Sequence, residues 1–391
     1  MAGPNHARAL RVLVAPDSFK GSLQAHEAAQ YIAAGILQAA PGWTVTQAPM
    51  ADGGEGTAKV VAASLRGAWH AIPVINANGD LIEIPFAVCR SSALKEFAIF
   101  DAAQVVGLPA ARVAAPARTT RGIGQAVRAI AGCGYTTIVI GLGGSSTNDG
   151  GAGMLSELAY QFDDVRGSAF HPVLATLPAI DAVHKRPDAG WLAGIRLIAL
   201  TDVTSPLSGP RGATQVFGAQ KGVTDLEAAD RALCRFAEQL TVLLNEDFSH
   251  AAGSGAAGGL GFAVRALGGS LRPGAEFILD TLGLNGTAMD FDWVITGEGR
   301  SDAQTLLGKV PTTIARLARA RGIPVTLLSG AIEAGSALSG AFDGCFSVLP
   351  APVSLDYAMQ HAGPLLQDAA FNLARLFASL PAAATGPAQP D

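Results

Sequence analysis

The chain has 391 residues, of which 49% are hydrophobic and only 15% are charged, and its formal net charge is −5. This composition excludes a disordered chain, and the lack of a Lys/Arg run argues against a nucleic-acid partner or a polybasic membrane surface. The longest charge-free stretch, 129–148, ends in Thr, Gly and Ser, so no membrane helix is predicted. Residues 1–11 lack the apolar core of a signal peptide and the four cysteines are scattered, which favours a cytoplasmic location.

Strand and helix patterns alternate at both ends of the chain. The opening predicts a strand, a helix, a strand and a helix over 10–15, 23–39, 44–48 and 57–65. The tail predicts strands at 291–296, 325–328 and 345–349 and helices at 305–321 and 355–380. Such β-α repeats are typical of a parallel sheet.

The middle of the chain is more mixed. Its predicted strands lie at 81–88, 97–100, 136–141 and 195–200, and its predicted helices at 121–131, 150–160 and 224–244. Thr224 and Glu227 are a candidate capping box for the last of these helices, whereas 162–192, with three prolines, shows no clear pattern.

We therefore expect an α/β protein with two unlike α/β domains. A doubly wound, Rossmann-like domain would be built from both chain ends, 1–67 and 285–391. A second α/β domain, 68–284, would be inserted between them. Sequential domains are the alternative.

Carboxylates follow five predicted strands, at the end where open α/β sheets bind ligands. The segments concerned are mostly rich in glycine or hydroxyl residues and lie at 16–22, 50–57, 143–151, 201–202 and 297–302. Each segment alone is better explained by a turn or a helix cap; Asp17 and Ser18, for example, could cap a helix that begins near Ser22. All five together favour a ligand site.

The residue types in these segments are those of phosphoryl transfer. Glycines let main-chain N–H groups approach an anion, so 143–146, before a predicted helix, is a candidate anion loop. Lys20, Arg300 and Lys309 could neutralise phosphate oxygens, and Asp or Glu could bind Mg²⁺. The seven histidines lie outside these segments, so a carboxylate is the expected general base.

Other ligand motifs fit poorly. Gly308-Lys309 is followed by Val310, so the Walker phosphate loop is absent. Residues 253–258 match the dinucleotide pattern G-x-G-x-x-G, but a predicted helix precedes them, and close helix packing is the alternative for the glycines of 253–261. No G-x-S-x-G surrounds Ser145, which argues against a hydrolase elbow.

Six motifs, in order over about residues 10–380, resemble the bacterial glycerate kinases of the glyoxylate- and glucarate-utilisation type. They are APDSFKGS (15–22), PMADGGEGT (49–57), GGSSTNDGGAGM (143–154), VFGAQKG (216–222), GAAGGLG (255–261) and TGEGRSDAQT (296–305). The resemblance implies an ATP- and Mg²⁺-dependent kinase that phosphorylates D-glycerate on its 2-hydroxyl. It also implies a site between two unlike α/β domains.

The chain departs from the family pattern at three places. The family usually has Tyr where this chain has Arg121, and commonly has Glu where it has Asp101. It has Asn-Pro-Leu-Cys where residues 205–208 are Ser-Pro-Leu-Ser.

Loop chemistry and the resemblance together imply the following roles. The expected nucleotide-binding residues are Gly143, Gly144, Ser145, Thr147, Asn148, Lys221 and Lys309. Either of the two lysines could instead be a solvated cation at a helix end. The expected catalytic residues are Asp202 as general base, Arg300, Asp302 and Lys20. The expected substrate-binding residues are Asp17, Ser18, Asp52, Glu55 and Arg300. The expected Mg²⁺ ligands are Asp202, Glu298 and Asp149. Asp149 could instead position the loop, and Asp302, Asp52 or Glu55 could also bind the ion.

Several alternatives remain open from the sequence. The 3-hydroxyl of glycerate, or a related small hydroxy acid, could be the acceptor. The same loops could serve a Mg²⁺-dependent phosphatase that needs no nucleotide, or a binding protein without turnover. A nicotinamide dehydrogenase is disfavoured by the context of 253–258.

Overall fold

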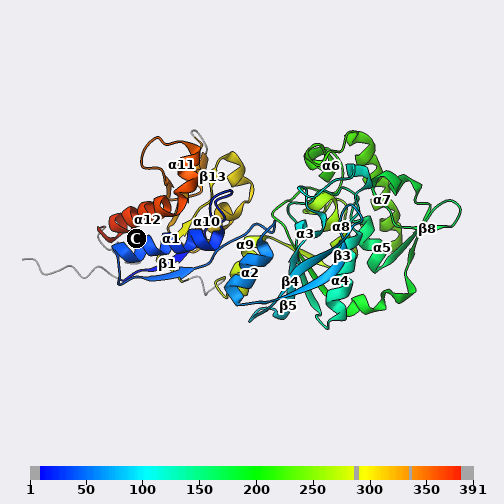
Figure 1. Cartoon of the computed structure of the whole chain (residues 1–391), viewed down its shortest axis with the longest axis horizontal. Coiled ribbons are helices and arrows are strands. Elements are labelled where there is room, and N and C mark those ends of the chain that lie inside the picture. The colour runs from blue at the N-terminus through cyan, green and yellow to red at the C-terminus, as the bar shows by residue number, and fades with distance from the viewer. Residues whose placement is uncertain (1–8, 286–289, 334–336, 380–391) are drawn as a thin grey trace, which may run out of the picture. The chain divides into compact units, whose positions relative to one another are not determined.

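The computed structural model describes residues 9–285, 290–333 and 337–379 (Figure 1). The chain divides into two compact units: unit 1 comprises Met1–Met50 and Gly286–Asp391, and unit 2 comprises Ala51–Asn285. Both contain helices and parallel strands, so the fold class is α/β as expected. Among the described helices, none combines the length and the apolar character needed to cross a membrane.

Unit 1 contains a five-stranded parallel sheet in the order β16-β14-β12-β1-β2. Its strands are β1 (Arg11–Val14), β2 (Thr44–Gln47), β12 (Trp293–Thr296), β14 (Val325–Ser329) and β16 (Gly344–Ser347). A separate two-stranded sheet pairs β13 (Arg300–Ser301) with β15 (Ala331–Ile332). Its helices are α1 (Ala25–Ala39), α10 (Val310–Arg319), α11 (Leu355–Gln360) and α12 (Ala362–Ser379), with 3₁₀ turns at Ala303–Leu307 and Ala337–Gly340.

Segments from opposite ends of the sequence form the core of unit 1. Strand β1 pairs with β12, and α1 packs along α12, which Figure 1 shows as neighbouring blue and red helices. Val12, Trp293 and Leu328 share one buried cluster with these two helices. The alternate residues Leu13 and Val294 are also fully buried, so the opposite face of the sheet is covered too.

Unit 2 contains a six-stranded sheet in the order β11-β10-β6-β5-β4-β3, in which β3-β4 and β4-β5 are antiparallel and the other pairs parallel. Its strands are β3 (Ala68–Ile75), β4 (Leu81–Ser91), β5 (Lys95–Asp101), β6 (Thr137–Gly141), β10 (Arg196–Leu200) and β11 (Ser270–Arg272). A small sheet joins β7 (Tyr160–Asp163), β8 (Ala169–Phe170) and β9 (Ala182–Lys185).

Helices cover both faces of the large sheet. The α-helices of unit 2 are α2 (Thr57–Leu65), α3 (Ala103–Val106), α4 (Arg121–Gly132), α5 (Ala152–Leu158), α6 (Ala213–Phe217), α7 (Leu226–Leu244), α8 (Leu260–Ala266) and α9 (Gly274–Thr281). Its 3₁₀ turns are Ala115–Ala117, Leu174–Ala179, Pro187–Gly194, Ala219–Lys221 and Ala256–Gly258. Phe100 and Ile140 face the main core, which α4, α5, α7 and α8 complete. Phe97 points the other way and meets Phe277 of α9 edge-on, with ring centroids 5.9 Å apart.

The first unit ends earlier than the expected boundary after residue 67. Residues 51–67 belong to unit 2, because α2 packs on β4 and β5 rather than on the sheet of unit 1. The main-chain N–H groups of Gly56 and Ala58 also donate to Asp101 at the end of β5. The other boundary, after Asn285, lies one residue from the expected one.

Four local predictions need correction. The tail helix is divided at His361 into α11 and α12, and its predicted last residue, 380, lies outside the described residues. Asp225, not Thr224, is the N-cap of α7, and its carboxylate accepts the N–H of Ala228 at 2.9 Å. The unpatterned stretch 162–192 contains most of the small sheet, and β3 was not predicted.

Candidate active site

The residues predicted for one site belong to both units. Unit 1 contains Asp17, Ser18, Lys20, Glu298, Arg300, Asp302 and Lys309. Unit 2 contains Asp52, Glu55, Gly143, Gly144, Ser145, Thr147, Asn148, Asp149, Asp202 and Lys221. Most of them follow the carboxyl ends of parallel strands, so each unit has its own group of polar strand-end residues.

In unit 1 the segments after β1 and β12 lie against each other. The N–H of Asp17 donates to Gly297 O at 2.8 Å, and a Cβ on Gly299 would stand 3.2 Å from Lys20 N. The Asp17 carboxylate accepts the N–H of Ser18, while α1 begins only at Ala25. Asp17 and Ser18 therefore do not cap that helix, and the loop holds the exposed Lys20 beside Gly299.

Glu298 is the most enclosed carboxylate of the unit 1 group. Its Oε1 accepts the hydroxyls of Ser301 at 3.0 Å and Thr305 at 2.7 Å, and its Oε2 lies 3.7 Å from Lys309 Nζ. These contacts fix the carboxylate and give it a cationic partner. Lys309 is therefore paired within unit 1, at the N-cap of α10.

Arg300 and Asp302 differ in exposure. The Arg300 side chain is 69% exposed, with Asp302 and Glu333 at 3.9 and 4.0 Å, so its guanidinium remains accessible to an anion. Asp302 is the N-cap of the 3₁₀ turn that follows, where its Oδ1 accepts the N–H of Gln304 at 2.8 Å. One of its carboxylate oxygens is thus engaged locally.

In unit 2 residues 52–56, which we call the glycine loop, pack against the carboxyl ends of β6 and β10. Gly143 N donates to Gly53 O at 3.1 Å, and a Cβ on Gly143 would fall 2.4 Å from Gly54 Cα. The Asp52 carboxylate accepts the N–H of Gly54 at 2.8 Å and so shapes the same loop. The expectation that Gly143 donates to a phosphate does not fit, because its N–H is already used within the protein.

Asp202 follows β10 and lies at the N-terminus of α9. Its Oδ1 accepts the N–H of Gly274 at 3.0 Å, and the residue is half-buried. A Cβ on Gly274 would lie 2.4 Å from Gly53 N, so the glycine loop also reaches this point. The Asp202 carboxylate therefore has a fixed orientation, and its Oδ2 is shielded from solvent although the residue as a whole is half-buried.

The loop that follows β6, residues 143–151, is mostly buried and forms hydrogen bonds with other buried side chains of unit 2. Gly144 is exposed with φ +79°, whereas residues 145–149 are buried. Asn148 donates its Nδ2 to Thr214 Oγ1 at 2.8 Å. Lys221, expected as a phosphate contact or a solvated cation, is buried and donates to Ser145 Oγ at 3.0 Å and Thr147 O at 2.9 Å.

Asp149 is expected either to position the loop or to bind Mg²⁺, and its contacts within unit 2 favour the first role. It is fully buried and accepts the hydroxyl and N–H of Thr120 at 2.8 and 3.1 Å and the N–H groups of Gly151 and Gly153 at 3.0 and 3.4 Å. Burial raises its pKa, and these hydrogen bonds oppose the rise. With four donors already in place, the carboxylate joins the start of α4 to the start of α5.

The glycines of 253–261 serve close packing. A Cβ on Gly258 would stand 2.0 Å from Thr147 O, and one on Gly259 would stand 2.4 Å from Gly150 Cα. Gly150 N donates to Gly258 O at 2.9 Å. Helix α7, not a strand, precedes the segment, which agrees with the packing alternative and not with a dinucleotide fingerprint.

Within the described ranges, no three or more His, Cys, Asp or Glu side chains come together as a metal site. Mg²⁺ commonly takes only one or two protein carboxylates together with substrate phosphates.

Comparison with known proteins decides the family. The model of the glycerate kinase family matches residues 12–378. The chain belongs to the glycerate kinase family. It is 34% identical over 373 residues to a glycerate kinase of Bacillus subtilis (strain 168), covering 93% of this chain and 97% of the relative.

Two further relatives extend the comparison. Glycerate 2-kinase of Escherichia coli (strain K12) is 34% identical over 377 residues, which cover 94% of this chain and 98% of the relative. A crystal structure of a protein assigned as glycerate kinase 2, from Salmonella typhimurium LT2, superposes with a TM-score of 0.81 at 34% identity, covering 94% and 98% of the two chains. Membership of this family makes the protein a kinase.

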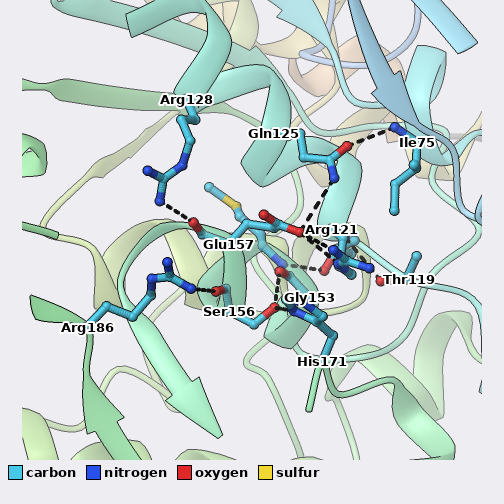
Figure 2. Close-up of polar contacts among 12 residues, drawn as sticks. Ile75, Thr119, Arg121, Gln125, Arg128, Gly153, Ser156, Glu157, His171 and Arg186 are labelled. Atoms are coloured by element: carbon cyan, nitrogen blue, oxygen red, sulfur yellow. Dashed lines mark hydrogen bonds and ion pairs between the residues drawn. The ribbon is translucent and has the colours of Figure 1, made fainter. Parts of the chain in front are cut away.

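Arg121, where the family pattern has Tyr, joins two helices of unit 2. Figure 2 shows its guanidinium beside Glu157 of α5, with Nε 2.7 Å and Nη2 2.6 Å from Oε1. Arg128 donates to the main-chain oxygen of Glu157 at 2.6 Å. The departure at Arg121 thus has a partner within the chain.

Asp101, where the family commonly has Glu, anchors the glycine loop; no motif in the sequence indicates this role. It is buried and accepts the N–H groups of Gly56 at 2.9 Å and Ala58 at 3.0 Å. Burial raises its pKa to about 7, the two hydrogen bonds oppose this, and the charges of Glu55 and Asp52 add to the rise. The carboxylates of Asp52 and Glu55 are therefore near enough to Asp101, at the end of β5, to affect its ionisation.

We expect Asp101→Asn to change the pH dependence of stability. The carboxyl binds its proton more tightly in the folded chain, so its contribution is present below about pH 4 and is lost as the pH rises to about 7. Since Asn does not titrate, the variant should gain stability relative to the wild type over this interval, by up to about 4 kcal/mol. Urea unfolding at several pH values measures this difference, and parallel curves for the two proteins would reject it.

Proposed function

We propose that the protein transfers the γ-phosphoryl group of ATP, with Mg²⁺, to the 2-hydroxyl of D-glycerate. The observation that carries the proposal is the match to E. coli glycerate 2-kinase over 377 residues. The family match over residues 12–378 spans the strand-end residues of both units. The products would be ADP and 2-phosphoglycerate, formed in the cytoplasm.

The loop after β6 has unused capacity for a polar ligand. Ser146 Oγ, Thr147 Oγ1 and Asn148 Oδ1 are buried and have no hydrogen-bond partner among the described residues. Gly144 is the exposed point of this loop. We assign nucleotide phosphates to the segment Gly144–Asn148, without the N–H of Gly143. Asp202 or Glu298 would hold Mg²⁺, which would supply neutralisation of the charge that develops on the phosphate groups during transfer.

Asp202 is the proposed general base. Its Oδ1 is held by Gly274 N, which orients the carboxylate while leaving it half-buried. In the transfer step the glycerate 2-oxygen bonds to the γ-phosphorus, the bond from that phosphorus to the bridging β-γ oxygen breaks, and the hydroxyl proton moves to Asp202. The carboxylate then releases the proton to solvent.

Cations of unit 1 are proposed to bind the anionic substrate. Arg300 has an exposed guanidinium and, within the described part of the chain, long ion-pair contacts to Asp302 and Glu333, so it can pair with the glycerate carboxylate. Lys20 is exposed on the adjacent loop and would contact the same carboxylate or the transferring phosphoryl group. Asp17, Ser18, Asp52 and Glu55 remain proposed substrate contacts, and Lys309, Asp302 and Glu298 proposed supporting groups.

Nucleotide dependence tests the proposed activity against the phosphatase alternative. Purified protein with MgATP should release ADP only when D-glycerate is added, in a coupled ADP assay. Incubation with 2-phosphoglycerate and Mg²⁺, without nucleotide, should release no inorganic phosphate. Phosphate release in that second reaction, with no ADP formed in the first, would replace the kinase by a phosphatase.

We expect Arg300→Lys to raise the KM for glycerate by about 10- to 100-fold, because lysine cannot form a forked, two-point contact with a carboxylate. The KM for ATP should change little. Steady-state kinetics with each substrate varied in turn measures both constants. Arg316→Lys, on α10 and outside the proposed site, serves as the matched control. An unchanged KM for glycerate would remove Arg300 from substrate binding.

A further inference from the structure

Arg118 is a buried arginine that contacts three separate segments of unit 2. Its Nε donates to Val113 O at 3.0 Å, and its Nη1 donates to Ser146 O at 3.0 Å and to Lys221 O at 2.6 Å. The residue is only 9% exposed. The planar guanidinium therefore ties the loop after β6 to the chain around Lys221.

Lys221 completes this arrangement. Its Nζ donates to Ser145 Oγ at 3.0 Å and Thr147 O at 2.9 Å. Arg118 and Lys221, which we call the buried bracket, thus hold three consecutive residues, 145–147. These are the central residues of the segment assigned above to nucleotide phosphates.

The charges of the buried bracket also suit an anion. Burial lowers the pKa of both side chains, that of Lys221 to about 7; for Lys221, Asp149 raises the pKa and Arg118 lowers it further. Asp149 already accepts four hydrogen bonds from other groups. Two buried basic side chains and one enclosed carboxylate thus surround the loop, and an anion bound at the loop would reduce the electrostatic cost of charging the basic groups there.

We propose that Arg118 is a positioning residue of the nucleotide loop. It would hold Ser146 directly through the main-chain oxygen of that residue. It would also hold the main chain of Lys221, whose side chain in turn binds Ser145 and Thr147. The inference rests on the proposed function insofar as this loop binds phosphate groups. Neither the sequence motifs nor the family pattern described above assigns a role to Arg118.

Substrate kinetics of Arg118 variants distinguish positioning from a purely structural role. Arg118→Met removes all three hydrogen bonds, and Arg118→Lys keeps the charge but not the fork. We expect the KM for ATP to rise about 10- to 100-fold in Arg118→Met and less in Arg118→Lys, with the KM for glycerate nearly constant. Equal increases in both KM values, or a fall in kcat alone that matches the loss of folded protein, would overturn the proposal.

Arg112 provides the control on the same segment. Its side chain is 72% exposed and pairs with Asp80, so Arg112→Met removes an arginine and an ion pair without touching the loop. We expect both KM values of this variant to equal those of the wild type. A rise in the KM for ATP as large as that of Arg118→Met would contradict a specific role for Arg118.

Hydrogen exchange tests the inference without any substrate. The N–H of Ser146 donates to Val106 O at 2.7 Å, so it reports on the position of the loop. Exchange in a peptide covering 143–150 should be about tenfold faster in Arg118→Lys and Arg118→Met than in the wild type, with no change in the small sheet of β7, β8 and β9. Unchanged exchange in both variants would reject the proposal, even if the protein shows no kinase activity with glycerate. Faster exchange would support it in that case.

Discussion

Replacement of Asp202 by asparagine is expected to lower kcat by about 10²- to 10⁴-fold, the usual contribution of a general base. Asn keeps an oxygen that can accept the N–H of Gly274, so the loop and α9 should remain in place. The side chain would no longer take the hydroxyl proton of glycerate. Steady-state kinetics measures the loss, and circular dichroism together with the thermal midpoint verifies the fold.

Asp225 offers a matched control for this variant. Its carboxylate also accepts a main-chain N–H at a helix start, that of Ala228 at 2.9 Å, but it caps α7. Asp225→Asn should therefore leave kcat at the wild-type value. If Asp202→Asn turned over glycerate at nearly the wild-type rate, Asp202 would have no part in the chemical step.

The second large effect concerns stability. Asp149→Ala removes the common acceptor of Thr120, Gly151 and Gly153 and leaves Lys221 without its neighbouring carboxylate. Breaking one partner of a buried charged arrangement costs about 3–5 kcal/mol. We expect the free energy of unfolding, measured in urea, to fall by this amount.

The exposed Glu246 is the control for the loss of a carboxylate. Glu246→Ala should change the free energy of unfolding by less than about 0.5 kcal/mol. A stable Asp149→Ala protein whose only defect is weak Mg²⁺ dependence would contradict the structural role and restore the metal role first expected for this residue.

The sequence predicts the structure well where a strand or helix has a clear hydrophobic pattern and the strand belongs to a parallel sheet. Thr57–Leu65 is helical over the predicted residues, and the buried runs before Asp202 and Gly143 are strands. Because parallel strands carry ligand groups at their carboxyl ends, these patterns were enough to select the loops. They could not show which sheet a helix covers, so α2 was placed in the wrong unit.

Side-chain roles were harder to predict because they depend on burial. Lys221 and Asp149 have residue types suited to phosphate and Mg²⁺, but both are enclosed by unit 2 and bonded within it. Arg118 belongs to no motif, and no local signal marks an arginine that bonds to carbonyls about 30 and 100 residues away in sequence. The strand β3 was missed because its first four residues are exposed and Pro73 interrupts the pattern.

Phosphorus NMR of the reaction products tests the central claim most directly. Wild-type protein with MgATP and D-glycerate should form ADP and an equal amount of one new phosphomonoester. Its phosphorus signal should be split by a single proton, that on carbon 2 of glycerate, whereas a 3-phosphate would be split by two. No phosphorylated product from folded protein, with L-glycerate and tartronate tested in parallel, would contradict the proposed kinase, and splitting by two protons would contradict transfer to the 2-hydroxyl.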